Sequence, residues 1–238
     1  MTTHKSTVEE IRQRFDAEAD RYTNLATGQI ATVDALLAMN LVAEAASVTT
    51  PHARYVLDVG CGGGNYTLKL LERLPNLNVT LIDLSQVMLD HAVARVRQKS
   101  MGSVEAIQSD IRELDLGHER FDIILASAVL HHLRTDDEWR SVFQKLYDAL
   151  KSNGSFWIFD LVESPIPEIQ AIHWRRYGEY LTAIGGEAFR QELFDRIIAE
   201  DTPRSVPFQL ALLRAVGFSE VELLHKNSCY AAFGAIKK

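Results

Sequence analysis

The sequence predicts an α/β fold built on a doubly wound, mostly parallel sheet. The first observation is that short apolar runs and amphipathic helical patterns alternate several times between residues 54 and 160. This alternation requires crossover helices, and it predicts a sheet covered on both faces. The second is a glycine-rich stretch directly after the first apolar run. The third is the composition of the 238 residues, 47% hydrophobic and 24% charged, which suits a globular chain with a sizeable core.

Two helices are expected before the sheet. Apolar residues fall on one face over residues 6–22, where Ser6 and Glu9 have the spacing of a capping box. A second helical pattern covers residues 28–47. We therefore treat residues 1–50 as an N-terminal helical region that covers the functional site.

The core of the fold is expected over residues 51–164 and 206–238. Its strands are the apolar runs at 54–59, 77–83, 104–108, 121–126, 155–160, 221–224 and 230–236. Helices follow the glycine stretch, Ser85 and Thr135, and Asn153-Gly154 is expected to close the third of these. A further helix covers 206–215 and ends at Gly217. The last two strands read as a hairpin, so one of them should be antiparallel.

The alternation stops at residues 165–205, a segment too long for a simple crossover. Helical patterns on either side of Gly185-Gly186 predict an inserted helical cap. Its most distinctive stretch is 173–177, where aromatic and arginine side chains alternate. Such side chains suit a planar acceptor that carries a carboxylate or phosphate, which makes Trp174, Arg175 and Tyr177 candidate substrate-binding residues. The alternative is an amphipathic helix with solvated arginines.

The glycine-rich stretch reads Asp58-Val59-Gly60-Cys61-Gly62-Gly63-Gly64. A strand, a glycine turn and a helix N-terminus together form a cradle for a nucleotide. The dinucleotide fingerprint requires a glycine where this chain has Asn65, and no Gly-Lys-Ser/Thr ending follows, which excludes a P-loop. The acid-x-Gly-x-Gly-x-Gly pattern resembles the first motif of class I S-adenosylmethionine-dependent methyltransferases.

This resemblance covers roughly residues 54–160 and implies a seven-stranded sheet in the order 3-2-1-4-5-7-6 with S-adenosyl-L-methionine as cofactor. It implies that Asp58 orients the methionine amino group. Asp83, at the end of the second strand, would accept from the ribose hydroxyls. Asp110 would accept from the adenine amine while the Ile111 N–H meets a ring nitrogen. The other candidate cofactor-binding residues are Tyr22, Gly60, Cys61, Gly62, Leu84, Met88 and Ser127.

Simpler interpretations stay open for several of these residues. Asp110 has the position of a helix N-cap, Met88 has the spacing of a core residue, and Asp83 could be an exposed turn residue. Phe15 either packs on the domain or contacts the cofactor.

Methyl transfer needs little chemical catalysis from the protein, because the sulfonium methyl is already activated. The chain must place the acceptor in line and exclude water, and a base helps only if the acceptor loses a proton. His131 and His132 follow the fourth strand, where such a base would lie, and are the candidate catalytic residues. The alternative is a satisfied core histidine. No nearby Asp, Glu or Cys completes a metal site of usual spacing with the pair, so no metal is expected.

The expected function is methyl transfer to a small-molecule acceptor. A looser resemblance, carried by Phe15-Asp16, Tyr22 and the C-terminal helix and strands, points to tRNA wobble-uridine carboxymethyl-transfer enzymes, which use a carboxylated relative of the cofactor. A non-catalytic adenosylmethionine-binding regulator is the third interpretation. The net charge of −7 weighs against a nucleic-acid partner.

A cytoplasmic protein without a membrane partner is expected. Residues 1–10 lack an apolar signal core, and no apolar stretch approaches the length of a membrane span. The two cysteines, Cys61 and Cys229, lack metal-ligand spacing and fit a reducing compartment. The sequence leaves a homodimer open.

Overall fold

The computed structural model describes residues 5–24 and 28–238, and it contains one seven-stranded sheet in the order β3-β2-β1-β4-β5-β7-β6. The first five strands are parallel, and β7 runs antiparallel to both of its neighbours. The predicted fold class and strand order are confirmed. The strands are β1 (Tyr55–Val59), β2 (Asn78–Asp83), β3 (Val104–Gln108), β4 (Phe121–Ser127), β5 (Leu150–Leu161), β6 (Glu220–Asn227) and β7 (Tyr230–Ile236).

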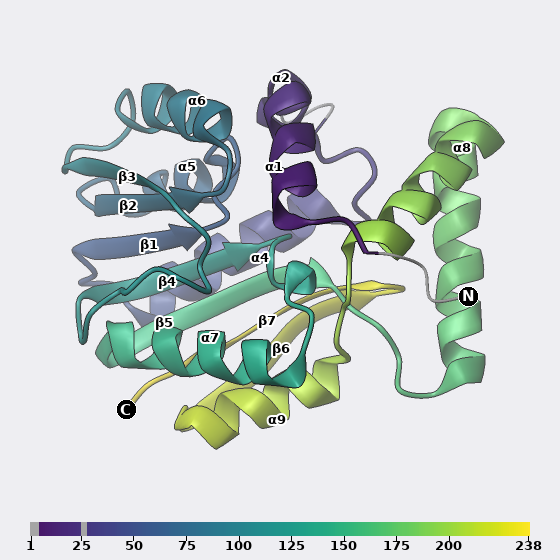
Figure 1. The fold of residues 1–238 in the computed structure, drawn as a ribbon. Helices are drawn as coiled ribbons and strands as arrows, with labels where there is room; N and C mark the ends of the chain where they lie inside the picture. Colours follow the sequence, from purple (N-terminus) through teal and green to yellow (C-terminus); the bar gives the residue numbers. More distant parts are fainter. Residues whose placement is uncertain (1–4, 25–27) are drawn as a thin grey trace.

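Helices lie on both faces of the sheet and beyond its edge (Figure 1). They are α1 (Val8–Ala17), α2 (Ala19–Thr23), α4 (Ala35–Thr49), α5 (Asn65–Leu71), α6 (Gln86–Val96), α7 (Asp136–Ala149), α8 (Pro167–Glu200) and α9 (Val206–Val216), with one turn of 3-10 helix, η1 (Leu130–His132). Thr135 and Glu138 form the expected capping box of α7, and Ser85 caps α6.

Successive residues of the central strands divide the core in two. Val56 of β1 packs into the cluster shared with α4, α5 and α6, whereas Leu57 packs into the cluster shared with α7 and α9. This alternation follows from the two-residue period of a strand. Both faces of the sheet are therefore covered by packed helices, and a ligand can reach the sheet only at the ends of its strands.

The N-terminal helices and α8 meet at the carboxyl ends of the parallel strands (Figure 1). The backbone N–H of Ser6 donates to Ala199 O over 2.9 Å, which ties the start of the described chain to the end of α8. α8 changes direction at Gly186, whose φ of 82° and ψ of 177° interrupt the helix. Only glycine adopts this conformation readily. Gly186 therefore sets the angle between the two arms of the segment predicted as a cap.

The N-terminal helix begins one residue later than predicted and is broken at Glu18. Thr7, not Ser6, forms the capping box, with Glu10 in place of Glu9. The reason is a tertiary contact, because the Ser6 N–H is already bonded to Ala199. Residues 1–4 of the predicted N-terminal region lie outside the described residues.

Two other boundaries differ from the prediction. The helix expected from residue 28 begins only at Ala35, since Asp34 has a left-handed backbone and its carboxylate is bonded to His225 and Asn227. Asn153-Gly154 does not close α7, which ends at Ala149. Instead Asn153 has a φ of 63° within β5, next to a register shift between β4 and β5. Within residues 5–24 and 28–238, no helix is long and apolar enough to cross a bilayer.

Candidate functional site

The glycine loop between β1 and α5 opens onto a cavity at the carboxyl ends of the strands. Gly60 and Gly62 have φ values of 63° and 50°, in the region that favours glycine. A Cβ on Gly60 would lie 2.4 Å from Val129 Cγ2, whereas a Cβ on Gly62 would meet no atom within 4 Å. Gly60 is thus required by packing, and Gly62 leaves room for a ligand. Cys61 holds the turn in place, because its N–H donates to Ile82 O over 2.9 Å.

Asp83 ends β2 beside this loop. Its carboxylate accepts from the Gly62 N–H over 2.8 Å and from the Ser85 N–H over 2.9 Å. Burial raises the pKa of Asp83, although these backbone donors oppose the shift. Asp83 is therefore not an exposed turn residue. These two hydrogen bonds leave other lone pairs of the Asp83 carboxylate free, so it can still accept from a pair of hydroxyls.

Asp58 lies at the bottom of the cavity, buried beneath the loop. It accepts from the Thr67 hydroxyl over 2.6 Å. Burial, with the charge of Asp83 adding to it, raises the pKa of Asp58 to about 7. Nearby, the neighbouring hydroxyls of Tyr66 and Ser127 are buried and have no well-aligned hydrogen-bond partner among the described residues. This corner of the cavity is polar and under-satisfied, which suits a ligand that brings its own hydrogen-bonding groups.

Asp110 follows β3 and lies against the same cavity. It accepts from the Arg112 N–H over 2.9 Å, as expected of the cap interpretation, and forms an ion pair with the Arg112 side chain at 2.5 Å. Burial opposes the effect of this arginine, but the net result is a lowered pKa for Asp110. The carboxylate is ionised and fixed in orientation, with Ile111 buried beside it.

The two histidines of η1 stand at the other end of the cavity. His131 Nδ1 is hydrogen-bonded to Asp160 Oδ1 at the end of β5, and Asp160 Oδ2 accepts from the His131 N–H over 3.0 Å. Burial acts to lower the pKa of His131, but the charges of Asp160 and Asp201 outweigh it and raise the pKa to about 9. His131 therefore carries a proton at neutral pH. Only its Nε2 is left to exchange a proton with the cavity.

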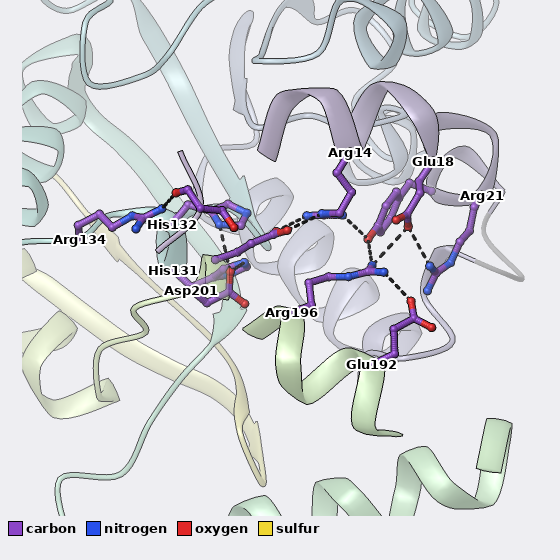
Figure 2. A network of polar contacts seen from close by, with 12 residues as sticks. Arg14, Glu18, Arg21, His131, His132, Arg134, Glu192, Arg196 and Asp201 are labelled. Atoms are coloured by element: carbon purple, nitrogen blue, oxygen red, sulfur yellow. Dashed lines mark hydrogen bonds and ion pairs between the residues drawn. The ribbon is translucent and has the colours of Figure 1, made fainter. Parts of the chain in front are cut away.

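Helices α1 and α8 cover this end of the cavity with ion pairs (Figure 2). Arg14 of α1 is bonded to Glu200 of α8 through two contacts of 2.7 and 2.5 Å. Arg196 of α8 reaches back to Glu18 at 3.3 Å. Both arginines also donate to the Tyr22 hydroxyl, over 3.1 and 3.3 Å. These bonds close the cavity with side chains that a ligand must pass.

One cavity brings together nearly all of the predicted site residues. It is lined by every predicted cofactor-binding residue and by both histidines: Tyr22, Asp58, Gly60, Cys61, Gly62, Asp83, Leu84, Met88, Asp110, Ile111, Ser127, His131 and His132. Phe15 lines it as well, 5.4 Å from the Tyr22 ring between centroids.

The candidate substrate-binding residues are divided by the structure. Tyr177 lines the cavity, and its hydroxyl pairs with that of Tyr230 at 3.1 Å. Trp174 packs edge-on against Phe194 across the kink of α8, with 4.8 Å between ring centroids. Arg175 lies on the surface in an ion pair with Glu179. The structure therefore does not bring Trp174 or Arg175 to the cavity.

Several lining residues were not singled out from the sequence. Asp160 ends a buried strand, as Asp83 does, and that shared position was a usable signal. Arg14, Arg196 and Asp201 carry no such signal, because only the tertiary fold brings α1 and the end of α8 to the strand ends.

Comparison with known proteins identifies the same region of the chain. Residues 56–154 match a family described as a methyltransferase domain. The chain is 25% identical over 186 residues to the carboxy-S-adenosyl-L-methionine synthase of Nautilia profundicola, covering 76% of each protein. It is 32% identical over 99 residues to a malonyl-[acyl-carrier protein] O-methyltransferase of Acetivibrio thermocellus. That match covers 42% of this chain and 32% of the enzyme, about a third of its length.

A solved structure with a similar fold is the 1,6-didemethyltoxoflavin-N1-methyltransferase of Burkholderia thailandensis, bound to 1,6-didemethyltoxoflavin and S-adenosylhomocysteine. Its TM-score is 0.65 at 20% identity, and the match covers 100% of this chain and 93% of that one. At this identity the match shows a shared fold.

The residues present fit an adenosylmethionine cofactor. The open side of Gly62 gives a ligand access to the loop backbone, Asp83 retains acceptor capacity, and the Tyr66 and Ser127 hydroxyls have no well-aligned hydrogen-bond partner among the described residues. Together with the motif, the sheet order and the matched domain, these observations lead to one conclusion. Residues 56–154 match a methyltransferase domain, and the chain has the fold of class I S-adenosylmethionine-dependent methyltransferases.

Proposed function

We propose that this protein transfers the methyl group of S-adenosyl-L-methionine to a small-molecule acceptor held between the strand ends and helices α1 and α8. The observation that carries the proposal is the enclosure of the cavity at its histidine end. The Arg14–Glu200 pair lies across it, with side chains only 18% and 9% exposed. An acceptor inside is shielded from water, which methyl transfer requires.

Four aromatic side chains contribute to the wall of the cavity. They are Phe15, Phe159, Tyr177 and Tyr230. Rings of this kind contribute most to the binding of flat apolar molecules. A small planar acceptor fits this lining better than a segment of a macromolecule, because covering helices would have to separate to admit a chain.

In this proposal, the cofactor takes the glycine-loop half of the cavity. Asp58 receives the methionine ammonium, Asp83 the ribose hydroxyls, and Asp110 with the Ile111 N–H the adenine. When bound, the cofactor supplies an activated methyl group. The protein contributes position, enclosure and, through His131 Nε2, the nearest group that could exchange a proton with an acceptor.

The test is turnover with cofactor labelled in its methyl group, against acceptors grouped by nucleophile: phenols, carboxylic acids, amines and aromatic ring nitrogens. Transfer to one class, with matching release of S-adenosylhomocysteine, supports the proposal. Asp83→Ala serves as the control for cofactor dependence. Tight cofactor binding without transfer to any acceptor would instead favour the regulator interpretation.

A second candidate is chemistry on a carboxylated form of the cofactor. It is favoured by the match to a carboxy-S-adenosyl-L-methionine synthase over 76% of the chain. Arg196, in the predicted cap, lines the cavity and could meet an added carboxylate. Mass spectrometry of the small molecules that copurify with the protein distinguishes the two cofactors. Titration with tRNA at low and high salt tests the related tRNA interpretation, which predicts salt-sensitive binding.

The domain boundaries belong to the same proposal. Residues 1–50 and 165–205 would form the acceptor-binding cover, and residues 51–164 and 206–238 the cofactor-binding core. A cytoplasmic location and a homodimer are further parts of it. Fluorescence imaging of the tagged chain tests the location, and analytical ultracentrifugation tests the assembly.

A further inference from the structure

Three potential metal ligands meet at the histidine end of the cavity. His131 and His132 come from η1, after β4, and Asp201 immediately follows α8. Each offers one ligand atom, and the three atoms lie within 4.8 Å of one another. All three residues line the cavity, and Figure 2 shows them grouped together.

The spacing of these atoms matches a bound ion. His132 Nδ1 lies 3.1 Å from Asp201 Oδ1, and His131 Nε2 lies 3.7 Å from the same oxygen. Ligands about 2.1 Å from a tetrahedral zinc ion are separated by about 3.4 Å. The two measured distances bracket that value. Small rotations of the side chains would therefore be enough to admit an ion.

The surroundings of His131 resemble the outer support of a metal ligand. A ligating histidine usually donates its second ring nitrogen to a carboxylate, which fixes the ring. Here the Asp160 carboxylate is hydrogen-bonded to His131 Nδ1, so His131 Nε2 is directed at Asp201. The Thr202 N–H donates to His131 O over 2.7 Å, which anchors the end of α8 to η1.

Independent support comes from His132. Its Nδ1 is buried and has no well-aligned hydrogen bond among the described residues, although it contacts Asp201 Oδ1 at 3.1 Å. A buried nitrogen in this state is under-satisfied and directed toward the proposed ion.

The local charge also accommodates a dication. Asp160 and Asp201 are two carboxylates, while Arg14 is already matched by Glu200. On binding, the ion would displace the proton that His131 Nε2 carries, and a divalent ion with two neutral histidines would then balance the two carboxylates.

We propose that His131, His132 and Asp201 bind a divalent transition-metal ion, with Asp160 orienting His131. Two histidines and one carboxylate are a ligand set used for zinc and for iron(II), and three protein ligands leave a position open. That position faces the cavity, where it could hold an oxygen or nitrogen of the acceptor. Binding of the ion needs only these side chains, so it does not depend on methyl transfer, but a bound ion would occupy His131 Nε2 and take the place of the proton exchange considered above.

The test uses untagged, chelator-treated protein titrated with Zn²⁺ by calorimetry, and with Co²⁺ as an absorption probe. One ion per chain is expected, with ligand-field bands of a low-symmetry site. Asp160→Asn should weaken Zn²⁺ binding about 10- to 100-fold, the range for an orienting partner. His132→Ala and Asp201→Asn should weaken it further. His52→Ala, an exposed histidine outside the cavity, is the matched control and should change nothing.

Binding of S-adenosylhomocysteine to each variant shows that its cofactor half is folded. The absence of saturable Zn²⁺ binding to the wild-type chain would overturn the proposal. So would wild-type Zn²⁺ affinity in folded His132→Ala and Asp201→Asn proteins, because the ion would then lie elsewhere.

Discussion

Substitution of Gly62 separates ligand contact from folding. Its backbone is left-handed, with a φ of 50°, and an added Cβ meets no protein atom within 4 Å. The cost to the fold is therefore the backbone term alone, about 1–2 kcal/mol for an L-residue in this region. The protein should remain folded, with a lowered free energy of unfolding.

The effect on cofactor binding should be larger. In the proposed complex the space beside Gly62 belongs to the cofactor, so a methyl group there overfills a packed contact. Overpacking costs about 1–3 kcal/mol, and 1.4 kcal/mol is a factor of ten, so Gly62→Ala should weaken binding by about 5- to 150-fold. Gly62→Val, with two further carbons, should abolish binding.

Calorimetry with S-adenosylhomocysteine measures the affinity, and urea unfolding measures the stability. Gly117→Ala is the matched control, since Gly117 also has a positive φ, an added Cβ there would approach only the flexible Arg120 side chain, and Gly117 does not line the cavity. It should lose stability and keep its affinity. Wild-type affinity in a folded Gly62→Val protein would show that the loop does not touch the cofactor.

Three further predictions address the cofactor half and the fold. Asp83→Ala should weaken S-adenosylhomocysteine binding by about 1–3 kcal/mol, the range for lost hydrogen bonds to a charged group, and an unchanged calorimetric affinity would contradict the ribose assignment. Burial and the charge of Asp83 raise the pKa of Asp58 to about 7, whereas a bound methionine ammonium favours the ionised carboxylate. The affinity for S-adenosylhomocysteine should therefore rise between about pH 6 and 8, and binding should release a proton. The free protein should show the opposite trend, since the folded chain binds a proton at Asp58 that the unfolded chain, with a pKa of about 3.9, releases. Stability should thus decline from about pH 4 to 7, and Asp58→Asn should remove both slopes; a slope that persists in the variant arises elsewhere. Thr135→Ala should lower the free energy of unfolding by about 1 kcal/mol through loss of the α7 cap and leave cofactor affinity unchanged, and a loss of affinity would mean that α7 influences the site.

The fold was predictable wherever local pattern and tertiary packing agree. Buried parallel strands are short apolar runs, and the capping box at Thr135 and Glu138 begins α7 as expected. The failures occur where a tertiary contact decides between two local options. Ser6 and Thr7 each have an acid three residues later, and a bond from Ser6 to Ala199 leaves Thr7 as the cap. No local pattern contains that bond.

The prediction that Asn153-Gly154 closes α7 failed for a related reason. Both residues favour a left-handed backbone, which a helix end and an irregular strand can use equally well. The sequence identified the conformation of Asn153, but only the pairing of β4 with β5 places it inside a strand.

The cofactor half of the cavity follows the same logic as the fold. Asp58, Asp83 and Asp110 each lie within or directly after a strand, and parallel strands end at one edge. Once the strands are recognised, these residues must converge. Their positions in the cavity are a consequence of topology, and side-chain detail such as the Arg112 pair at Asp110 is what the sequence could not supply.

The histidine half of the cavity is formed by segments that are far apart in the sequence and share no repeating pattern. No acid at a usual ligand spacing accompanies His131 and His132 in the sequence, which argued against a metal, yet the return of α8 places Asp201 3.1 Å from His132. The same return brings Arg196 and Glu200 over the cavity while Arg175, on the other arm of α8, faces solvent. The bend at Gly186 thus lets both arms of α8 contribute to the site, the first through Tyr177 and the second through Arg196 and Glu200. Under the proposed function, the geometry of α8 would shape the acceptor site. We therefore expect acceptor-binding residues among 187–201 as well as at Tyr177, rather than at Trp174 and Arg175.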